Sequence, residues 1–187
     1  MLEARDVPSA SYYWSPTNNC GVTMFGGLLT TQTEGNDING QPAISHISYI
    51  DGWLEVRGGT ISLSENFQGE NRATSTLHVN GNITLMGGVF TPRVYCDNTD
   101  SVDRLTTNGM LWLKPAFTIL PQVYHKSAAP AANPNGQNLE WTVLWAQLGI
   151  DTTAGMPTIG PAPDWDDPVK VQVGAFTGLK LKKLSAT

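Results

Sequence analysis

Charge is the scarcest property of this 187-residue chain. Asp, Glu, Lys and Arg make up 14% of the residues, against roughly 25% in an average soluble protein. Eleven basic residues stand against 16 acidic ones, so the net charge is −5 and the chain offers phosphate groups no positive surface; we expect no nucleic-acid partner. Disorder driven by charge repulsion is excluded too, because six tryptophans would have to remain in water.

Long apolar runs are missing as well. No stretch approaches the ~18 consecutive apolar residues of a membrane-spanning helix, so we expect no membrane partner. The first residues, MLEARDVPSASYYW, contain no basic segment followed by an apolar run, so no signal peptide is predicted. The only cysteines, Cys20 and Cys96, fit no metal-ligand spacing; they favour assembly in a reducing cytoplasm and leave the disulfide state open.

The motifs of common enzymes are absent from the sequence. His46, His78 and His125 lie far apart and none is part of an H-E-x-x-H motif, and there is neither a G-x-S-x-G elbow nor a nucleotide-binding P-loop. Acidic residues cluster at 97–103, where Asp103 is the last, and at 164–167, but without the spacing of a calcium loop. We interpret both clusters as solvated turns and predict no enzyme, no catalytic residue, no metal and no cofactor.

What the chain does contain is an internal repeat. The segment DGWLEVRGGTISL begins at Asp51, NGNITLMGGVFTP begins at Asn80, and NGMLWLKPAFTIL begins at Asn108, so the offsets are 29 and 28 residues. A fainter copy, CGVTMFGGLL, begins at Cys20 and is one residue short between its glycines. A fixed period of this length is typical of architectures in which one structural unit is repeated.

Each copy predicts β-structure, because apolar and polar residues alternate on both sides of an Asp-Gly or Asn-Gly pair that can supply a type I′ turn. We therefore predict hairpins, with the structural turns at Asp51, Gly52, Asn80, Gly81, Asn108 and Gly109. The double glycines Gly58-Gly59 and Gly87-Gly88 predict a bulge, a sharp corner or a close backbone approach. The predicted fold class is all-β, with hairpin repeats of 28–29 residues that either stack like a β-helix or pack as a sandwich or jelly roll.

Proline and alanine set the last third of the chain apart. We divide the chain into an N-terminal arm (1–19), a β-repeat domain (20–120), a Pro-rich and Ala-rich arm or connector (121–168) and a C-terminal β-hairpin (169–187). Within the connector, Trp141, Leu144, Trp145 and Leu148 have the spacing of a short helix. The alternation over 139–145 fits a strand equally well, so the sequence leaves this element open.

Aromatic residues provide the candidate contact sites. Trp53 and Trp112 lie within two residues of a predicted turn, and Tyr12, Tyr13 and Trp14 lie in the N-terminal arm. Aromatic anchors beside uncharged polar residues suit a protein interface, so we take these five as interface candidates. A surface that stacks against sugars is the alternative for Trp53 and Trp112.

The segment TLHVNGNITLMGGVF at 76–90, echoed at 51 and 108, resembles the β-rich, low-charge repeats of bacteriophage virion structural proteins. These include trimeric tail fibres, head fibres and the cement or decoration proteins of capsids. The resemblance covers residues 45–120. It implies an intertwined homotrimer, assembled in the host cytoplasm and attached to the virion by an arm, without a cofactor.

We therefore expect a capsid decoration (cement) protein that stabilises the phage head by bridging capsomers. Its partners would be copies of itself and the major capsid protein or another virion protein, held by residues 1–14 and 121–134. The alternative is a tail-fibre or receptor-binding module that recognises a host surface glycan. A polysaccharide-cleaving spike enzyme fits less well, because its β-helix normally needs more coils than this length allows.

Overall fold

The computed structural model describes residues 12–14, 21–31, 46–63, 75–95, 98–124, 139–160, 169–174 and 178–183. In these ranges every regular element is a β-strand, which confirms the predicted all-β class. None of the described residues forms a helix that is long and apolar enough to cross a membrane. Cys20 and Cys96, His125 and the acidic cluster at 164–167 lie outside the described residues, as do residues 1–11 and 15–19 of the predicted N-terminal arm and 125–138 and 161–168 of the predicted connector.

The strands follow one another in five coils. The first coil contains β1 (Tyr12–Trp14), β2 (Val22–Met24) and β3 (Leu28–Leu29), and the second contains β4 (His46–Ile50), β5 (Leu54–Val56) and β6 (Thr60–Ile61). The third runs through β7 (Ser75–Val79), β8 (Ile83–Leu85), β9 (Gly88–Phe90), β10 (Arg93–Tyr95) and β11 (Asn98–Val102). The fourth contains β12 (Arg104–Thr107), β13 (Met110–Leu113), β14 (Phe117–Ile119) and β15 (Gln122–Tyr124). The fifth contains β16 (Leu139–Ala146), β17 (Gly149–Asp151) and β18 (Thr158–Ile159), followed by β19 (Val169–Gly174) and β20 (Gly178–Lys183).

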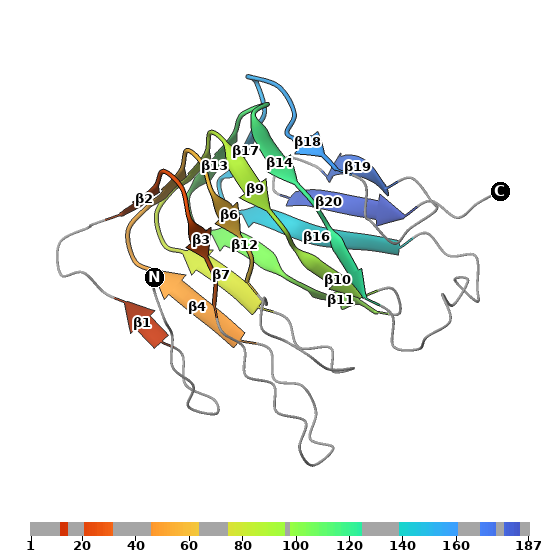
Figure 1. Ribbon diagram of the computed structural model, residues 1–187, viewed down its shortest axis with the longest axis horizontal. Helices are drawn as coiled ribbons and strands as arrows, with labels where there is room; N and C mark the ends of the chain where they lie inside the picture. The colour runs from red at the N-terminus through yellow and green to blue at the C-terminus, as the bar shows by residue number, and fades with distance from the viewer. Residues whose placement is uncertain are drawn as a thin grey trace, which may run out of the picture.

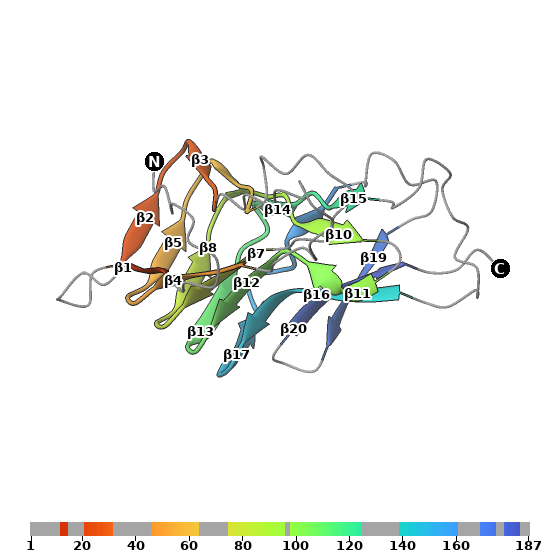
Figure 2. The same cartoon turned by 90° about the horizontal axis from the view of Figure 1, so that it is seen from below.

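Equivalent strands of successive coils pair and build three sheets. Sheet A has the order β1-β4-β7-β12-β16-β20-β19, sheet B β17-β13-β8-β5-β2, and sheet C β18-β14-β9-β6-β3, while β11, β10 and β15 form a small fourth sheet. Sheet C crosses in front of sheet A in Figure 1, and Figure 2 shows the strands of sheet B side by side in coil order. Parallel strands stacked in register in this way form a β-helix, one of the architectures that the sequence left open.

The register confirms the repeat but not the predicted hairpins. Leu54 pairs with Ile83, and Ile83 pairs with Leu111, at the offsets of 29 and 28 residues read from the sequence. The two strands on either side of each Asp-Gly or Asn-Gly pair do not pair with each other. They belong to different sheets, A and B, and each pairs in parallel with its counterpart one coil away. The predicted turn is therefore a corner of the β-helix, and the alternative of a β-sandwich is wrong.

The faint copy that begins at Cys20 is part of the same helix. Val22 pairs with Leu54 and Leu28 pairs with Thr60, so both strands of this coil have an offset of 32 residues. The double glycines of the two coils therefore align, and Gly21 stands in register with Trp53 rather than with Gly52. Residues 15–21 separate β1 from β2 in this coil, where only 51–53 separate β4 from β5 in the next.

The core lies between the three sheets. Alternate side chains of each strand point inward, and equivalent residues stack on one another from coil to coil. The stacked residues, almost all fully buried, are Leu54, Ile83 and Leu111; Val56, Leu85 and Leu113; and Ile61, Phe90 and Ile119. Each such side chain contributes roughly 1.5–3 kcal/mol relative to an exposed one, so the rows hold neighbouring coils together.

The double glycines form the second corner, between sheets B and C. Gly27, Gly59 and Gly88 have φ values of +83°, +90° and +95°, which L side chains rarely adopt. A Cβ on Gly59 would lie 2.6 Å from the carbonyl oxygen of Gly27, and one on Gly88 would lie 2.8 Å from that of Gly59. The predicted sharp corner and close backbone approach are both confirmed.

The three corners differ in length. The first corner has two or three residues between β4 and β5, β7 and β8, β12 and β13, and β16 and β17. The second is also short in the first four coils. The third corner, between sheets C and A, takes 30–45, 62–74, 91–103 and 120–138 in successive coils, and in two of them it contains additional strands. The third corner is therefore the longest of the three, and the first coil also differs at its first corner, where residues 15–21 separate β1 from β2.

Residues 139–146 form strand β16, so this element is a strand and not the short α-helix that the sequence also allowed. A bulge between Thr142 and Leu144 interrupts its pairing with β20. Because of the bulge, Val143 and Leu144 are both buried, together with Trp141 and Ala146. The chain then adds β20 and β19, which pair antiparallel and extend sheet A beyond the last coil.

Candidate binding surfaces

The first corner stacks the predicted turn residues into a ladder. Asp51, Asn80 and Asn108 occupy equivalent positions on three successive coils. The Asn80 Nδ2 donates to Asp51 Oδ1 at 2.6 Å, and the Asn108 Nδ2 donates to Asn80 Oδ1 at 3.3 Å. Asn80 therefore uses both ends of its amide to join the coils, and the ladder is a structural feature of the corner.

The glycines beside this ladder do not serve the predicted purpose. A type I′ turn needs positive φ, and Gly52, Gly81 and Gly109 are not among the glycines with positive φ. Instead, Gly81 N donates to Gly52 O at 2.7 Å, and a Cβ on Gly81 would overlap that oxygen. A Cβ on Gly109 would lie 2.7 Å from Gly81 O. The type I′ prediction is therefore wrong, and Gly81 and Gly109 are required instead by the close approach of one coil to the next.

The interface candidates Trp53 and Trp112 lie on the outer face of sheet B. One outward row across the coils consists of Thr23, Glu55, Thr84, Trp112 and Asp151, and the next consists of Trp53, Asn82 and Met110. Trp53 is 41% exposed and Trp112 is half-buried. Their strands, β5 and β13, are two strand spacings or about 10 Å apart. The structure thus brings both tryptophans to one face, with polar side chains between them.

Trp53 also covers the first coil. A Cβ on Gly21 would overlap the indole ring of Trp53, and Val22 N donates to Trp53 O at 2.7 Å. The absence of a side chain on Gly21 therefore leaves room for the indole. Sequence reasoning gave Gly21 no role, although its shifted place in the faint repeat copy marked the difference.

Charged side chains flank the aromatic residues on this face. Arg57 Nε forms an ion pair with Glu55 Oε1, and the Arg57 guanidinium lies 5.5 Å from the centre of the Phe25 ring, in the range of a cation–π contact. The Thr153 N–H donates to Asp151 Oδ1 at 2.8 Å. That hydrogen bond is the main cause that lowers the pKa of Asp151, with Lys114 adding to it, so this end of the face stays negative at neutral pH.

The outer face of sheet A carries a second row of aromatic and polar residues. Its register runs Tyr49, His78, Thr106 and Trp145. The rings of Tyr49 and His78 meet edge to face at 5.6 Å, and His78 Nδ1 lies 2.8 Å from Thr106 Oγ1. Burial lowers the pKa of His78, while hydrogen bonds with the corner asparagines oppose that shift.

The remaining interface candidates, Tyr12, Tyr13 and Trp14, lie in β1 at the edge of sheet A, where β1 pairs with β4. They are on a different sheet from Trp53 and Trp112, so the five candidates do not form one cluster. The placement of the β1 side chains lies outside the described part of the chain.

One acidic residue was misjudged from the sequence. Asp103 is 1% exposed, and its two carboxylate oxygens accept the backbone N–H groups of Ser75 at 2.8 Å and Arg93 at 3.0 Å. Asp103 N in turn donates to Arg93 O at 2.9 Å. Asp103 is therefore a buried link at the third corner, not a solvated turn residue. Its place directly before a strand is the only signal that the sequence offered.

The described residues contain no group of three or more His, Cys, Asp or Glu side chains that could hold a metal ion. Comparison of the chain with protein-family models, with curated proteins and with solved structures found no match. The outer face of sheet B is therefore chosen as the candidate binding surface on its residues alone.

Proposed function

We propose that this protein is a bacteriophage capsid decoration protein that binds the shell through the outer face of sheet B. The composition of that face carries the proposal. Tryptophan, methionine and arginine are enriched in protein interfaces and dominate their binding energy, and Trp53, Trp112, Met110 and Arg57 lie there in adjacent outward rows. The resemblance of residues 45–120 to virion structural proteins points to the same class.

The β-helix suits this role mechanically. Each outward residue is fixed by a strand that pairs on both sides within sheet B, except in the edge strands β2 and β17. A rigid surface loses little conformational entropy when it binds, which raises affinity. A protein that binds only the assembled shell stabilises that state by mass action, and this is how capsomers would be held together.

The test is to add the purified protein to empty capsids that lack it. We expect many copies to sediment with the shell and the melting temperature of the shell to rise. Trp112→Ala should weaken binding roughly 30-fold or more, the effect of losing a residue that dominates an interface. The matched control is Trp145→Ala, which removes an exposed tryptophan from sheet A. Absence of binding, or equal losses in the two variants, would refute the proposal.

A glycan receptor is the second candidate, and one observation favours it. Glu55, Asn82 and Thr84 lie between Trp53 and Trp112. The rings can stack on the apolar faces of sugars, while these polar groups bond to hydroxyls. Retention on immobilised host glycans, weakened by Trp53→Ala or Trp112→Ala without loss of folding, is the expected result. A protein that passes through every glycan tested would exclude this alternative.

A further inference from the structure

Two Asn-Gly sequences, Asn80-Gly81 and Asn108-Gly109, lie at the first corner of the third and fourth coils. Asparagine deamidates readily before glycine, because glycine has no Cβ to hinder the approach of its nitrogen to the asparagine side chain. The glycine nitrogen attacks Asn Cγ and loses its proton, the bond from Cγ to Nδ2 breaks, and ammonia leaves. Water then opens the succinimide ring at either carbonyl, which gives aspartate or isoaspartate. The reaction therefore requires a glycine N–H that can leave its hydrogen-bond partner.

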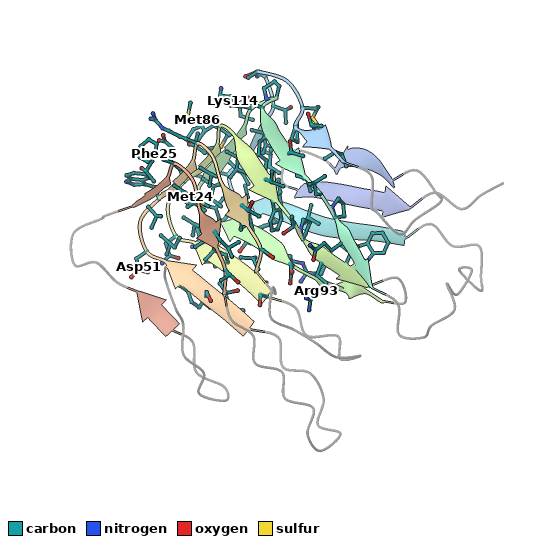
Figure 3. The ribbon with its side chains drawn as sticks, in the orientation of Figure 1. Met24, Phe25, Asp51, Met86, Arg93 and Lys114 are labelled. Atoms are coloured by element: carbon teal, nitrogen blue, oxygen red, sulfur yellow. The ribbon has the colours of Figure 1, made fainter. Side chains whose placement is uncertain are left out.

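At the third coil, both the asparagine and the glycine are held by the preceding coil. Gly81 N donates to Gly52 O at 2.7 Å, and Asn80 N donates to Ile50 O at 2.8 Å. The Asn80 Nδ2 donates to Asp51 Oδ1 at 2.6 Å. Figure 3 shows Asp51 at the edge of the β-helix, where the chain leaves β4. All three acceptors belong to the second coil, so Gly81 N can reach Asn80 Cγ only when the two coils part.

At the fourth coil, the corresponding groups are held less firmly. The Asn108 Nδ2 donates to Asn80 Oδ1 at 3.3 Å, which is longer than the 2.6 Å of the equivalent bond made by Asn80. Gly109 N donates to Thr107 Oγ1 at 2.9 Å, so its acceptor is a side chain of the same coil. The Thr107 hydroxyl in turn donates to Gly81 O. Rotation of one threonine side chain therefore releases Gly109 N without separating the coils.

We propose that Asn108 is a site of spontaneous deamidation in the folded protein and that the corner ladder protects Asn80. A reaction that proceeds only from an opened state is slowed according to the fraction of time that the structure is open. Opening at Asn80 separates two coils, whereas opening at Asn108 moves the side chain of Thr107. Relative to the unfolded chain, we expect the reaction to be slowed at least about 100-fold at Asn80 and about 10-fold at Asn108.

Deamidation would alter the corner permanently, and more severely at Asn80. A carboxylate at position 108 cannot donate to Asn80 Oδ1, so the last hydrogen bond of the ladder would be lost. Isoaspartate also adds one backbone atom to this two-residue corner, which would disturb the register between β13 and β8. A carboxylate at position 80 would face Asp51 Oδ1, where like charges repel each other. The better protected asparagine is therefore the one whose conversion would be more damaging.

The test follows deamidation at each asparagine by peptide mapping and mass spectrometry, in the native protein and in urea at the same mildly alkaline pH. Asn39-Gly40 and Asn135-Gly136, which lie outside the described residues, serve as references for the rate in urea. Thr107→Val removes the hydroxyl that accepts from Gly109 N and keeps a side chain of similar shape. The matched control is Thr84→Val, which changes a half-buried threonine of sheet B. Circular dichroism establishes that both variants fold.

In urea, Asn80 and Asn108 should react at the rate of the two reference sequences. In the native wild type, Asn108 should react roughly 10-fold faster than Asn80. Thr107→Val should bring Asn108 close to its rate in urea while Asn80 stays slow, and Thr84→Val should change neither rate.

Native rates equal to those in urea would overturn the proposal, and so would an Asn108 that reacts no faster than Asn80. Equal acceleration of both sites in Thr107→Val would overturn it too, because the variant would then act by general destabilisation. The comparison of Asn108 with Asn80 in the wild type needs no variant, so the proposal can be refuted even if Thr107→Val does not fold.

Discussion

Replacing Gly81 by alanine tests whether close stacking, rather than backbone conformation, requires glycine at the first corner. The new Cβ would overlap Gly52 O and would lie 3.0 Å from Gly52 C and 3.5 Å from Trp53 N. Carbon atoms prefer a separation of about 3.5–4.0 Å, so the second and third coils must part by roughly 0.5–1 Å at this corner. The 2.7 Å hydrogen bond from Gly81 N to Gly52 O would lengthen with it.

The expected cost follows from that displacement. Inserting a methyl group into packed structure costs about 1–3 kcal/mol, and the lower entropy of unfolded alanine returns about 0.4–1 kcal/mol. We therefore expect a net loss of about 1.3 kcal/mol in the free energy of unfolding. For a chain of this size the melting temperature should fall by about 3–5 °C, which thermal unfolding followed by circular dichroism resolves.

Two other glycines separate the possible causes. Gly26→Ala meets no atom within 4 Å and has no positive φ, so it should be neutral or slightly stabilising. Gly27→Ala also meets nothing but has a φ of +83°, so it should cost about 1–2 kcal/mol through backbone strain alone. A Gly81→Ala variant as stable as Gly26→Ala would refute the stacking argument.

Two further predictions concern buried and titrating groups. Asp103→Ala removes the acceptor for two buried N–H groups and should lower the free energy of unfolding in urea by about 3 kcal/mol. The control Asp51→Ala loses one exposed hydrogen bond and should cost under about 1 kcal/mol. Equal costs in the two variants would contradict the role given to Asp103. Burial lowers the pKa of His78, so the unfolded chain binds the proton more readily and the free energy of unfolding should fall as the pH drops from about 7.5, through the unfolded value of about 6.5, towards 5. The fall should be smaller in His78→Asn, and an identical pH profile in the two proteins would show that His78 does not contribute.

The repeat could be read from the sequence, but the partner of each strand could not. An Asn-Gly pair between alternating segments is the pattern of a hairpin, and it is equally the pattern of a corner between two sheets. Asn80-Gly81 forms the corner because β7 and β8 each find a better partner one coil away. The information lay in the nearly equal offsets of the copies, which a hairpin turn does not require and a stacked β-helix does.

The ambiguity over residues 139–149 has a structural cause. A bulge between Thr142 and Leu144 advances the strand by one residue, so inward positions fall at 141, 143, 144 and 146. The step from 141 to 144 imitates the spacing of a helix, while 141 and 143 keep that of a strand. The burial of Asp103 could not be predicted either. The backbone N–H groups that donate to its carboxylate belong to Ser75 in sheet A and Arg93 in the small fourth sheet, and the sequence does not show that these strands meet.

The uneven corners also determine how such a protein can change. Where the first corner has only two or three residues, adding one would shift the next strand of sheet B by one position and turn its core side chains outward. Adding many residues between sheets C and A leaves every inward row where it is, as the gaps 62–74 and 120–138 already show by their different lengths. New loops, and new partners with them, can therefore accumulate along one side of the helix while the coils that carry them stay the same.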